Sequence, residues 1–206
     1  MKNKKVLFII VIIVVAVVFS IFRIYNVYKL KKVFKEISIA MGDLLNNCNF
    51  TYEVKCSGDS VSNMKKWVYN KEKVALQRTN SIYYADMTTN EMYVANMEDK
   101  TYTILNTSIL PQIRPEIFLN APTFYSVTQI QNLELLLVAT IKEEKLNNED
   151  CYKITMYNEE AWINKETLMP VKNICSMGEY TYSITQNNVT ENDVTFKDIN
   201  NFTETH

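Results

Sequence analysis

An uninterrupted apolar stretch near the start of the chain limits the fold more than any other feature. It runs from Val6 to Phe22, seventeen residues in which Ser20 is the only polar one. As a helix at 1.5 Å per residue it spans roughly 25 Å, close to the shortest length that crosses the hydrocarbon core of a bilayer. Three lysines precede it: Lys2, Lys4 and Lys5. The sequence therefore predicts a cytoplasmic stub at 1–5 and a transmembrane anchor at 6–23.

A cleaved signal peptide is the alternative explanation of this stretch. Val18 and Ser20 form a small-residue pair of the kind found at cleavage sites, but the stretch exceeds the usual length of about 7–15 apolar residues. Five basic residues follow within 23–35, and the positive-inside rule alone would place the domain in the cytoplasm. A basic start before an apolar segment favours export. We expect a single-pass protein of the cell membrane with an extracytoplasmic domain.

Charge is distributed unevenly along the chain. Residues 1–35 carry eight basic side chains and no acidic one, whereas residues 36–206 carry 14 basic and 23 acidic side chains, a net charge of −9. An acidic domain repels phosphate backbones, which argues against nucleic acid as a partner. The basic segment suits anionic lipid headgroups. The three glycines are isolated, so the chain contains no phosphate-binding loop and no dinucleotide fingerprint.

An amphipathic helix is predicted over 24–49, directly after the anchor. Its apolar positions recur at spacings of three and four: Val27, Leu30, Phe34, Ile37, Met41 and Leu44. Such a stripe packs against another apolar surface. It either covers a sheet of the same chain or, over 27–44, pairs with a second copy in a short homodimeric coiled coil.

From residue 50 the apolar period changes from 3.6 to 2. Phe50, Tyr52, Val54 and Cys56 alternate with polar residues, and short polar turns separate the segments that follow. Strands are predicted at 50–56, 64–69, 74–78, 82–86, 91–96, 101–106, 139–146, 151–157, 161–164, 169–175 and 180–186. Short strands joined by Asn-rich turns are typical of an antiparallel meander. The fold class is therefore α+β, with one domain over 50–206.

The middle of this domain has a different composition. Pro111, Pro115 and Pro122 exclude a central strand there. Apolar residues over 109–125 predict a segment that folds over the sheet, and 128–137 has the pattern of a second helix. A hydrophobic cavity under such a roof would suit an acyl chain. Its candidate lining residues are Trp67, Leu76, Tyr83, Ile104, Phe118, Phe124 and Trp162, although core packing is the more ordinary explanation for any single one of them.

The sequence offers no catalytic or metal-binding constellation. His206 is the only histidine, and the four cysteines lack the C-x-x-C spacing of zinc sites. We expect no enzyme activity, no cofactor and no metal. Outside the cytoplasm the cysteines could form disulfides, and four cysteines allow three pairings. Cys151–Cys175 is preferred because both lie on strands that could be neighbours, Cys48–Cys56 is a local option, and four reduced thiols remain the alternative.

Three stretches near the C-terminus resemble a known family. Residues 151–154 read Cys-Tyr-Lys-Ile, residues 161–172 read Ala-Trp-Ile-Asn-Lys-Glu-Thr-Leu-Met-Pro-Val-Lys, and residues 187–194 read Asn-Asn-Val-Thr-Glu-Asn-Asp-Val. They are similar to the LolA/LolB-like proteins of Gram-positive bacteria, a group that includes lipoprotein-sorting proteins and the clostridial germination lipoprotein GerS. The element order matches over 27–200. Leu168 stands where the family often has Gly, and the anchor replaces its usual lipidated Cys.

The resemblance implies a curved antiparallel sheet, an open half-barrel, with helices covering its concave side. Family members bind acyl chains, lipoproteins or protein partners there, and none is known for catalysis. The expected function is a non-enzymatic, membrane-tethered, extracytoplasmic binding domain that docks on or regulates an envelope or spore protein. The alternative is a carrier or chaperone that holds a lipid or lipoprotein acyl chain in the concavity.

Overall fold

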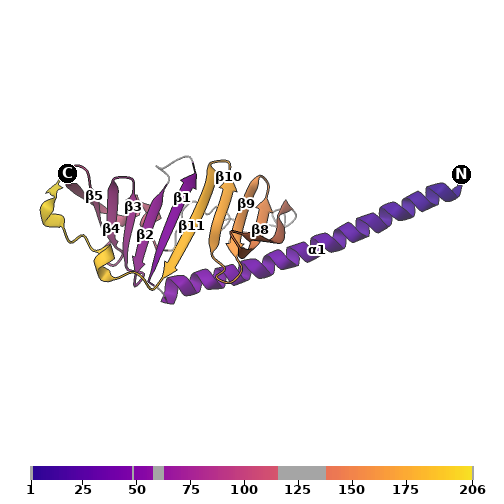
Figure 1. Cartoon of the computed structure of the whole chain (residues 1–206), viewed down its shortest axis with the longest axis horizontal. Helices are drawn as coiled ribbons and strands as arrows, with labels where there is room; N and C mark the ends of the chain where they lie inside the picture. The colour runs from indigo at the N-terminus through magenta and orange to yellow at the C-terminus, as the bar shows by residue number, and fades with distance from the viewer. Residues whose placement is uncertain (1, 48, 58–62, 116–137, 206) are drawn as a thin grey trace.

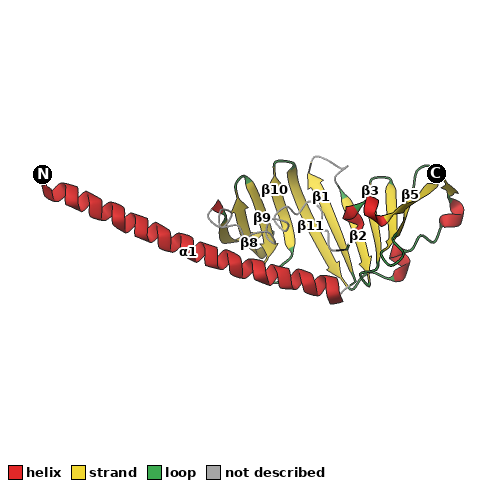
Figure 2. Cartoon of the chain, turned by 180° about the vertical axis from the view of Figure 1, so that it is seen from behind, coloured by secondary structure: helices red, strands yellow, loops and turns green. Residues whose placement is uncertain are grey.

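The computed structural model describes residues 2–47, 49–57, 63–115 and 138–205. It consists of one long helix, α1 (Lys2–Asn47), and one twelve-stranded sheet. The second half of α1 lies against the sheet, and the first half continues past the β8 end as a rod (Figures 1 and 2). This confirms the predicted α+β class with an open, curved sheet. The expected second helix at 128–137 lies outside the described residues.

The strands follow one another as a meander. They are β1 (Phe50–Ser57), β2 (Met64–Tyr69), β3 (Lys73–Arg78), β4 (Ser81–Asp86), β5 (Glu91–Asn96), β6 (Thr101–Asn106), β7 (Thr140–Leu146), β8 (Glu149–Met156), β9 (Glu159–Asn164), β10 (Pro170–Cys175), β11 (Gly178–Gln186) and β12 (Thr203–Glu204). Their order is β12-β6-β5-β4-β3-β2-β1-β11-β10-β9-β8-β7. All pairs are antiparallel except β12 with β6. The predicted strand segments are therefore present, and β12 is an addition that the alternation did not indicate.

Asparagine makes several of the tight turns possible. Asn70, Asn90, Asn147 and Asn148 all adopt positive φ angles, a conformation that asparagine tolerates better than most residues because its side chain bonds locally. Asn147 and Asn148 join β7 to β8, the hairpin that the sequence indicated most strongly. The Asn-rich composition is thus explained by the number of hairpins.

The sheet has an inner face, covered by α1, and an outer face. On the inner face Leu30, Val33, Phe34 and Ile37 of α1 form a cluster with the β7–β9 end of the sheet. Farther along α1, Leu44 packs into a second cluster with residues of the central strands. Because strand side chains alternate between faces, the predicted half-buried strands are confirmed.

Helix α1 continues without a break from the apolar stretch into the amphipathic segment. The sequence contains no Gly or Pro between residues 2 and 41, so nothing interrupts it at 23–24, where we expected a boundary. An 18-residue window of its first half has a mean hydropathy of 3.2, and none of it is buried. By length and composition this half can cross a membrane.

The apolar stripe of α1 is used within the chain. Leu30, Val33, Ile37 and Leu44 are at most 2% exposed, and all contact the chain's own sheet. Of the two expectations for 27–44, the structure therefore shows the covering helix. A homodimer through this stripe would need the surface that the sheet already covers.

Asn26 joins the start of this packed segment to the edge of the sheet. Its amide nitrogen donates to the Ala139 carbonyl at 2.9 Å, and its amide oxygen accepts from the Ile141 N–H at 3.1 Å. The side chain is buried. We predict that Asn26→Leu lowers the free energy of unfolding by about 1–3 kcal/mol, because two buried backbone groups lose their partners.

Urea denaturation of the full chain in detergent measures this change. Asn46→Leu is the control, because Asn46 is exposed and its bond to Lys71 lies at the surface. The control should change the free energy of unfolding by about 0.5 kcal/mol or less. Equal losses in the two variants would contradict the role of Asn26.

Glu143 on β7 holds α1 through a second contact. Its carboxylate accepts from the Lys29 ammonium of α1 and, at 2.8 Å, from that of Lys165. Both ammonium groups also lie over the Tyr152 ring. The hydrogen bonds from Lys165 and Lys29 lower the pKa of Glu143 from its ordinary 4.5 to about 2.

This depressed pKa predicts a pH-dependent contribution to stability. The carboxylate stabilises the folded chain above pH 4.5, and the contribution is lost as the pH falls toward about 2. The difference in unfolding free energy between the unaltered chain and Glu143→Gln should therefore be constant from neutral pH to about 5 and then shrink. At neutral pH it should be about 1 kcal/mol or less, since Glu143 is half-exposed.

Urea titrations across this pH range test the prediction. Glu166→Gln is the control, because Glu166 has no ion pair within 4 Å among residues that the structure describes. A difference for Glu143→Gln that grows on acidification would have the wrong sign and would refute the argument.

The C-terminal segment covers part of the outer face. Val189 and Val194 pack on Ala75, with Trp67 and Tyr84 beside them. Phe196 stacks on Tyr84 and contacts three further rings, those of Tyr93, Tyr102 and Phe202. β12 then pairs with β6. The tail thus lies along a sheet edge, and it also shields apolar residues behind that edge.

Candidate functional site

The five described residues that were predicted to line a cavity do not all lie on one face of the sheet. Leu76 and Tyr83 face each other across β3 and β4 on the inner face, within the main core. Trp67 packs on the outer face under the C-terminal segment. Ile104 is opposite Tyr93, which contacts Phe196, so it also points outward. Phe118 and Phe124 lie outside the described residues.

Trp162 is held on the outer face by polar and cationic groups. Its indole Nε1 donates to the Glu144 carboxylate at 2.6 Å. The ammonium groups of Lys153 and Lys172 lie 4.5 and 5.5 Å from its ring centroids. These contacts account for its burial at the surface of the sheet without any cavity.

Lys66 lies on the inner face, whereas its neighbour Trp67, the predicted cavity residue, lies on the outer face. It is 1% exposed, and its ammonium donates to the Arg114 carbonyl at 2.9 Å. Its cross-strand neighbours are Tyr52 and Leu76. The sequence did contain a signal, because Lys66 shares its strand face with Met64 and Val68, which are both apolar. Trp67, one position on, must point the other way.

Two tyrosines, on β1 and β11, lie on the same inner face as Lys66. Tyr52 and Tyr182 are buried and stack with their ring centroids 6.1 Å apart. Burial raises the pKa of each phenol above its ordinary value. Both hydroxyls therefore remain protonated at neutral pH and serve as hydrogen-bonding groups, not as bases.

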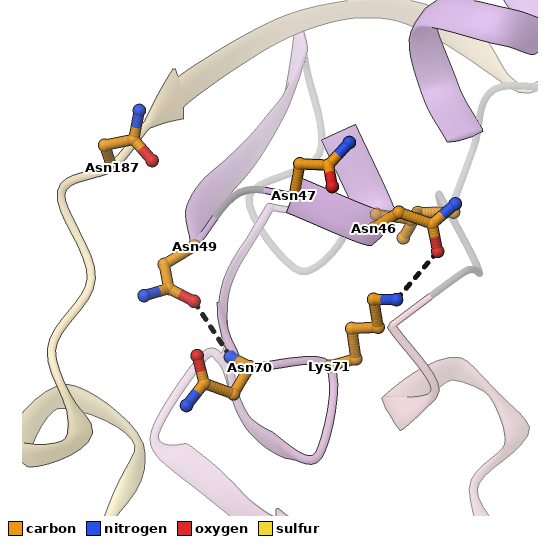
Figure 3. A pocket seen from close by; sticks show the side chains of 7 residues that line it. Asn46, Asn47, Asn49, Asn70, Lys71 and Asn187 are labelled. Carbon is orange, nitrogen blue, oxygen red and sulfur yellow. Dashed lines mark hydrogen bonds between the residues drawn. The ribbon is translucent and has the colours of Figure 1, made fainter. Parts of the chain in front are cut away.

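Two adjoining hollows lie where α1 ends against the sheet. The first has a volume of about 330 Å³ and is lined almost entirely by amides (Figure 3). Its lining residues are Leu45, Asn46, Asn47, Asn49, Asn70, Lys71 and Asn187. The Lys71 ammonium donates to Asn46 at 2.7 Å, and the Asn70 N–H donates to the Asn49 side chain at 2.8 Å. These bonds fix the turn after β2 against the end of α1.

The second hollow, of about 460 Å³, shares three residues with the first and extends toward η3 (Pro111–Ile113). It is lined by Leu45, Asn46, Lys71, Met87, Asn90, Thr107, Arg114 and Pro115. We call the two hollows together the amide mouth. It combines amide donors and acceptors with two cations, Lys71 and Arg114, and with the apolar Leu45 and Met87.

Sheet topology builds the amide mouth from distant parts of the sequence. β1 lies between β2 and β11, so the residues that precede β1 meet the turn after β2 and the end of β11. The Asn187 N–H donates to the Asn49 carbonyl across this junction. The sequence marked Asn46, Asn47 and Asn49 only as the end of a helix, because no local pattern shows which turns will adjoin it.

The amide mouth suits binding rather than reaction. In the described ranges no group of three or more His, Cys, Asp or Glu side chains could hold a metal ion. Amides and ammonium groups at neutral pH neither attack carbonyls nor transfer protons readily. They do pair with peptide groups, hydroxyls and carboxylates.

The preferred disulfide is not formed in this structure. Cys151 and Cys175 are free and lie on β8 and β10, which are separated by β9. Cys175 belongs to the inner core. Cys151 is three residues from Ile154, which points to the inner face. Because side chains alternate along a strand, Cys151 points outward. The expectation that their strands are neighbours was incorrect, because alternation locates strands without giving their order.

Comparisons with known proteins give distant structural likenesses only. No protein-family model and no curated protein matches the sequence. LprF from Mycobacterium bovis aligns with a TM-score of 0.45 and 11% identity over 79% of this chain and 94% of LprF. MucB in complex with MucA aligns at 0.35 and 11% over 78% of this chain and 58% of MucB. At such scores neither likeness assigns a family or a function, and the LolA/LolB-like resemblance stays a prediction.

Proposed function

We propose that this chain is a non-enzymatic binding domain, tethered to the cell membrane, that docks on a protein of the cell envelope or spore through the amide mouth. The observation that carries the proposal is the continuity of α1. One helix has an exposed apolar half that can cross a bilayer and a second half that buries one face against the sheet. Anchor and binding domain are therefore a single rigid unit.

The amide mouth lies at the far end of this unit. From residue 23 to residue 47, α1 rises roughly 36 Å at 1.5 Å per residue. An extracytoplasmic domain would thus present the mouth well away from the lipid, where another protein could reach it. Paired amides match a peptide backbone, and Lys71 with Arg114 would favour an acidic segment.

Site-specific photo-crosslinking in intact membranes tests this proposal. A photoreactive amino acid at Asn47, an exposed residue of the mouth, should give a discrete protein adduct. Lys71→Glu should weaken the adduct by about tenfold, because it replaces an attraction to an acidic partner by repulsion. Lys100→Glu is the matched control, since Lys100 and Lys71 are both turn lysines with positive φ. No adduct, or equal effects of the two substitutions, would refute docking at the mouth.

An acyl-chain carrier is the second candidate, and one observation favours it. The larger hollow has the volume of a small-molecule site, about 300–1,000 Å³, and Leu45 and Met87 line it beside the inner core. Native mass spectrometry of the full chain, released from detergent, would show a constant mass excess equal to one lipid. An unmodified mass throughout would exclude this function.

A further inference from the structure

The end of the domain that lies nearest the membrane carries a group of exposed apolar and aromatic side chains. They are Ile24, Tyr25 and Tyr28 on α1, Val138 beside β7, and Tyr157 in the turn after β8. Four of them are more than 60% exposed. A single exposed apolar residue is ordinary, but the fold brings these five to the same end of the domain.

The contacts of Asn26 place the two parts of this group together. Asn26 bonds to the backbone of Ala139 and Ile141, so the α1 turn that contains Ile24 and Tyr25 lies at the start of β7. Thr140 pairs with Thr155 in the β7–β8 register. The register begins at this pair, so Val138, which precedes β7, and Tyr157, in the turn after β8, lie at the same end of the two strands.

The distance to the apolar half of α1 is short. Asn26 follows Phe22, the last residue of the apolar stretch, by roughly 6 Å of helix rise. Helix α1 has no break here, and the Lys29–Glu143–Lys165 contacts hold it against the sheet. If residues 6–22 cross a bilayer, Val138 and Tyr157 are therefore carried to the level of its headgroups.

Basic side chains surround the same end of α1. Arg23, Lys31 and Lys35 have no acidic partner within 4 Å among the residues described, whereas the neighbouring Lys29 is bound by Glu143. Lys31 lies roughly 12 Å beyond Arg23 along the helix, comparable to the distance over which physiological salt screens a charge. These cations are thus available to anionic headgroups.

We propose that this end of the domain is a bilayer-contact surface, formed by Ile24, Tyr25, Tyr28, Val138 and Tyr157 and flanked by Arg23 and Lys31. Its occupant is the headgroup layer of a membrane that contains anionic lipid. Tyrosines favour that layer because their rings are apolar and their hydroxyls remain in water. The continuity of this surface with the apolar half of α1, and its uncompensated positive charge, both point to lipid.

The contact would fix the pose of the domain as well as its attachment. The β7–β8 end would rest on the bilayer, and the sheet would extend away from it toward β5 and β6. The amide mouth would then be held at one height and one orientation. This inference rests on the proposed membrane tether, and it adds a specific contact with anionic headgroups that crossing of the bilayer by α1 does not by itself supply.

Depth-dependent fluorescence quenching of the full chain in vesicles tests the inference. Tyr157→Trp places a reporter in the contact surface, and Met97→Trp places one in the turn between β5 and β6. Both positions are exposed turns, so neither change should disturb folding. The two sites are separated by eight strand spacings, roughly 38 Å along the sheet. Fluorescence of Trp67 and Trp162 is subtracted using the unaltered chain.

Vesicles of brominated phosphatidylcholine with unlabelled phosphatidylglycerol should quench the Tyr157→Trp reporter about twofold or more and leave the Met97→Trp reporter unchanged. Placing the bromine on phosphatidylglycerol at the same mole fraction should strengthen quenching, because the nearby cations attract anionic lipid. Lys31→Glu should reduce that increase.

The outcomes separate the two proposals. Protein that does not float with the vesicles would refute the tether. Protein that floats but shows equal quenching of the two reporters would refute the contact surface while leaving the tether intact. Quenching of the Tyr157→Trp reporter that is the same from both brominated lipids would overturn the assignment to anionic headgroups.

Discussion

Removal of residues 1–47 is expected to abolish folding of the sheet, whereas removal of residues 1–23 should leave a folded, detergent-free domain. The difference is the segment of α1 that covers the inner face. Its Leu30, Val33, Ile37 and Leu44 are almost completely buried. At about 1.5–3 kcal/mol for each fully buried side chain, these four contribute about 6–12 kcal/mol. That is comparable to the entire stability of a typical domain, about 5–15 kcal/mol.

Circular dichroism and urea denaturation of the two truncated chains measure this effect. The chain that begins at residue 24 should unfold in one cooperative transition. The chain that begins at residue 48 should show no transition and should aggregate, because both inner clusters would be exposed to water. A cooperative transition in the shorter chain would show that α1 is dispensable for the fold.

The sequence predicts the elements of this fold better than their assembly. Alternation locates the strands because each inner position faces a core, and the three-and-four spacing locates the buried stripe of α1. Even so, the stripe includes Val33, which the pattern omitted. Helix and strand periods depend on neighbours in sequence, and such neighbours are visible without a structure.

Residues whose role depends on partners far along the chain could not be predicted in this way. Trp67 was predicted to line an inner cavity, but strand alternation puts Lys66 on the inner face and Trp67 on the outer one, since Met64 and Val68 already occupy the inner face. The amide mouth requires Asn187 beside Asn49, which follows only from the pairing of β1 with β11. Nothing local specifies that pairing.

A charge on the buried side of α1 provides the second test with a large expected effect. Ile37 is 1% exposed within the β7–β9 cluster, whereas Ile39, two residues on, is 54% exposed. We expect Ile37→Asp to lower the free energy of unfolding by more than about 4 kcal/mol, since a carboxylate without a partner would replace a packed side chain. Ile39→Asp should change it by about 0.5 kcal/mol or less.

The pair tests which face of α1 is buried, and the oligomeric state distinguishes the covering helix from the coiled-coil alternative, because Ile37 would be buried in both. The two substitutions add the same charge to the same helix at nearly the same point along it, so differences in helix propensity cancel. Urea denaturation in detergent gives both free energies, and size-exclusion chromatography shows whether the oligomeric state changes. A large loss for Ile39→Asp, together with a mild effect of Ile37→Asp, would mean that α1 presents the opposite face to its partner. The packing described above, including the bonds of Asn26 to β7, would then be wrong, because they fix the rotation of α1 about its axis.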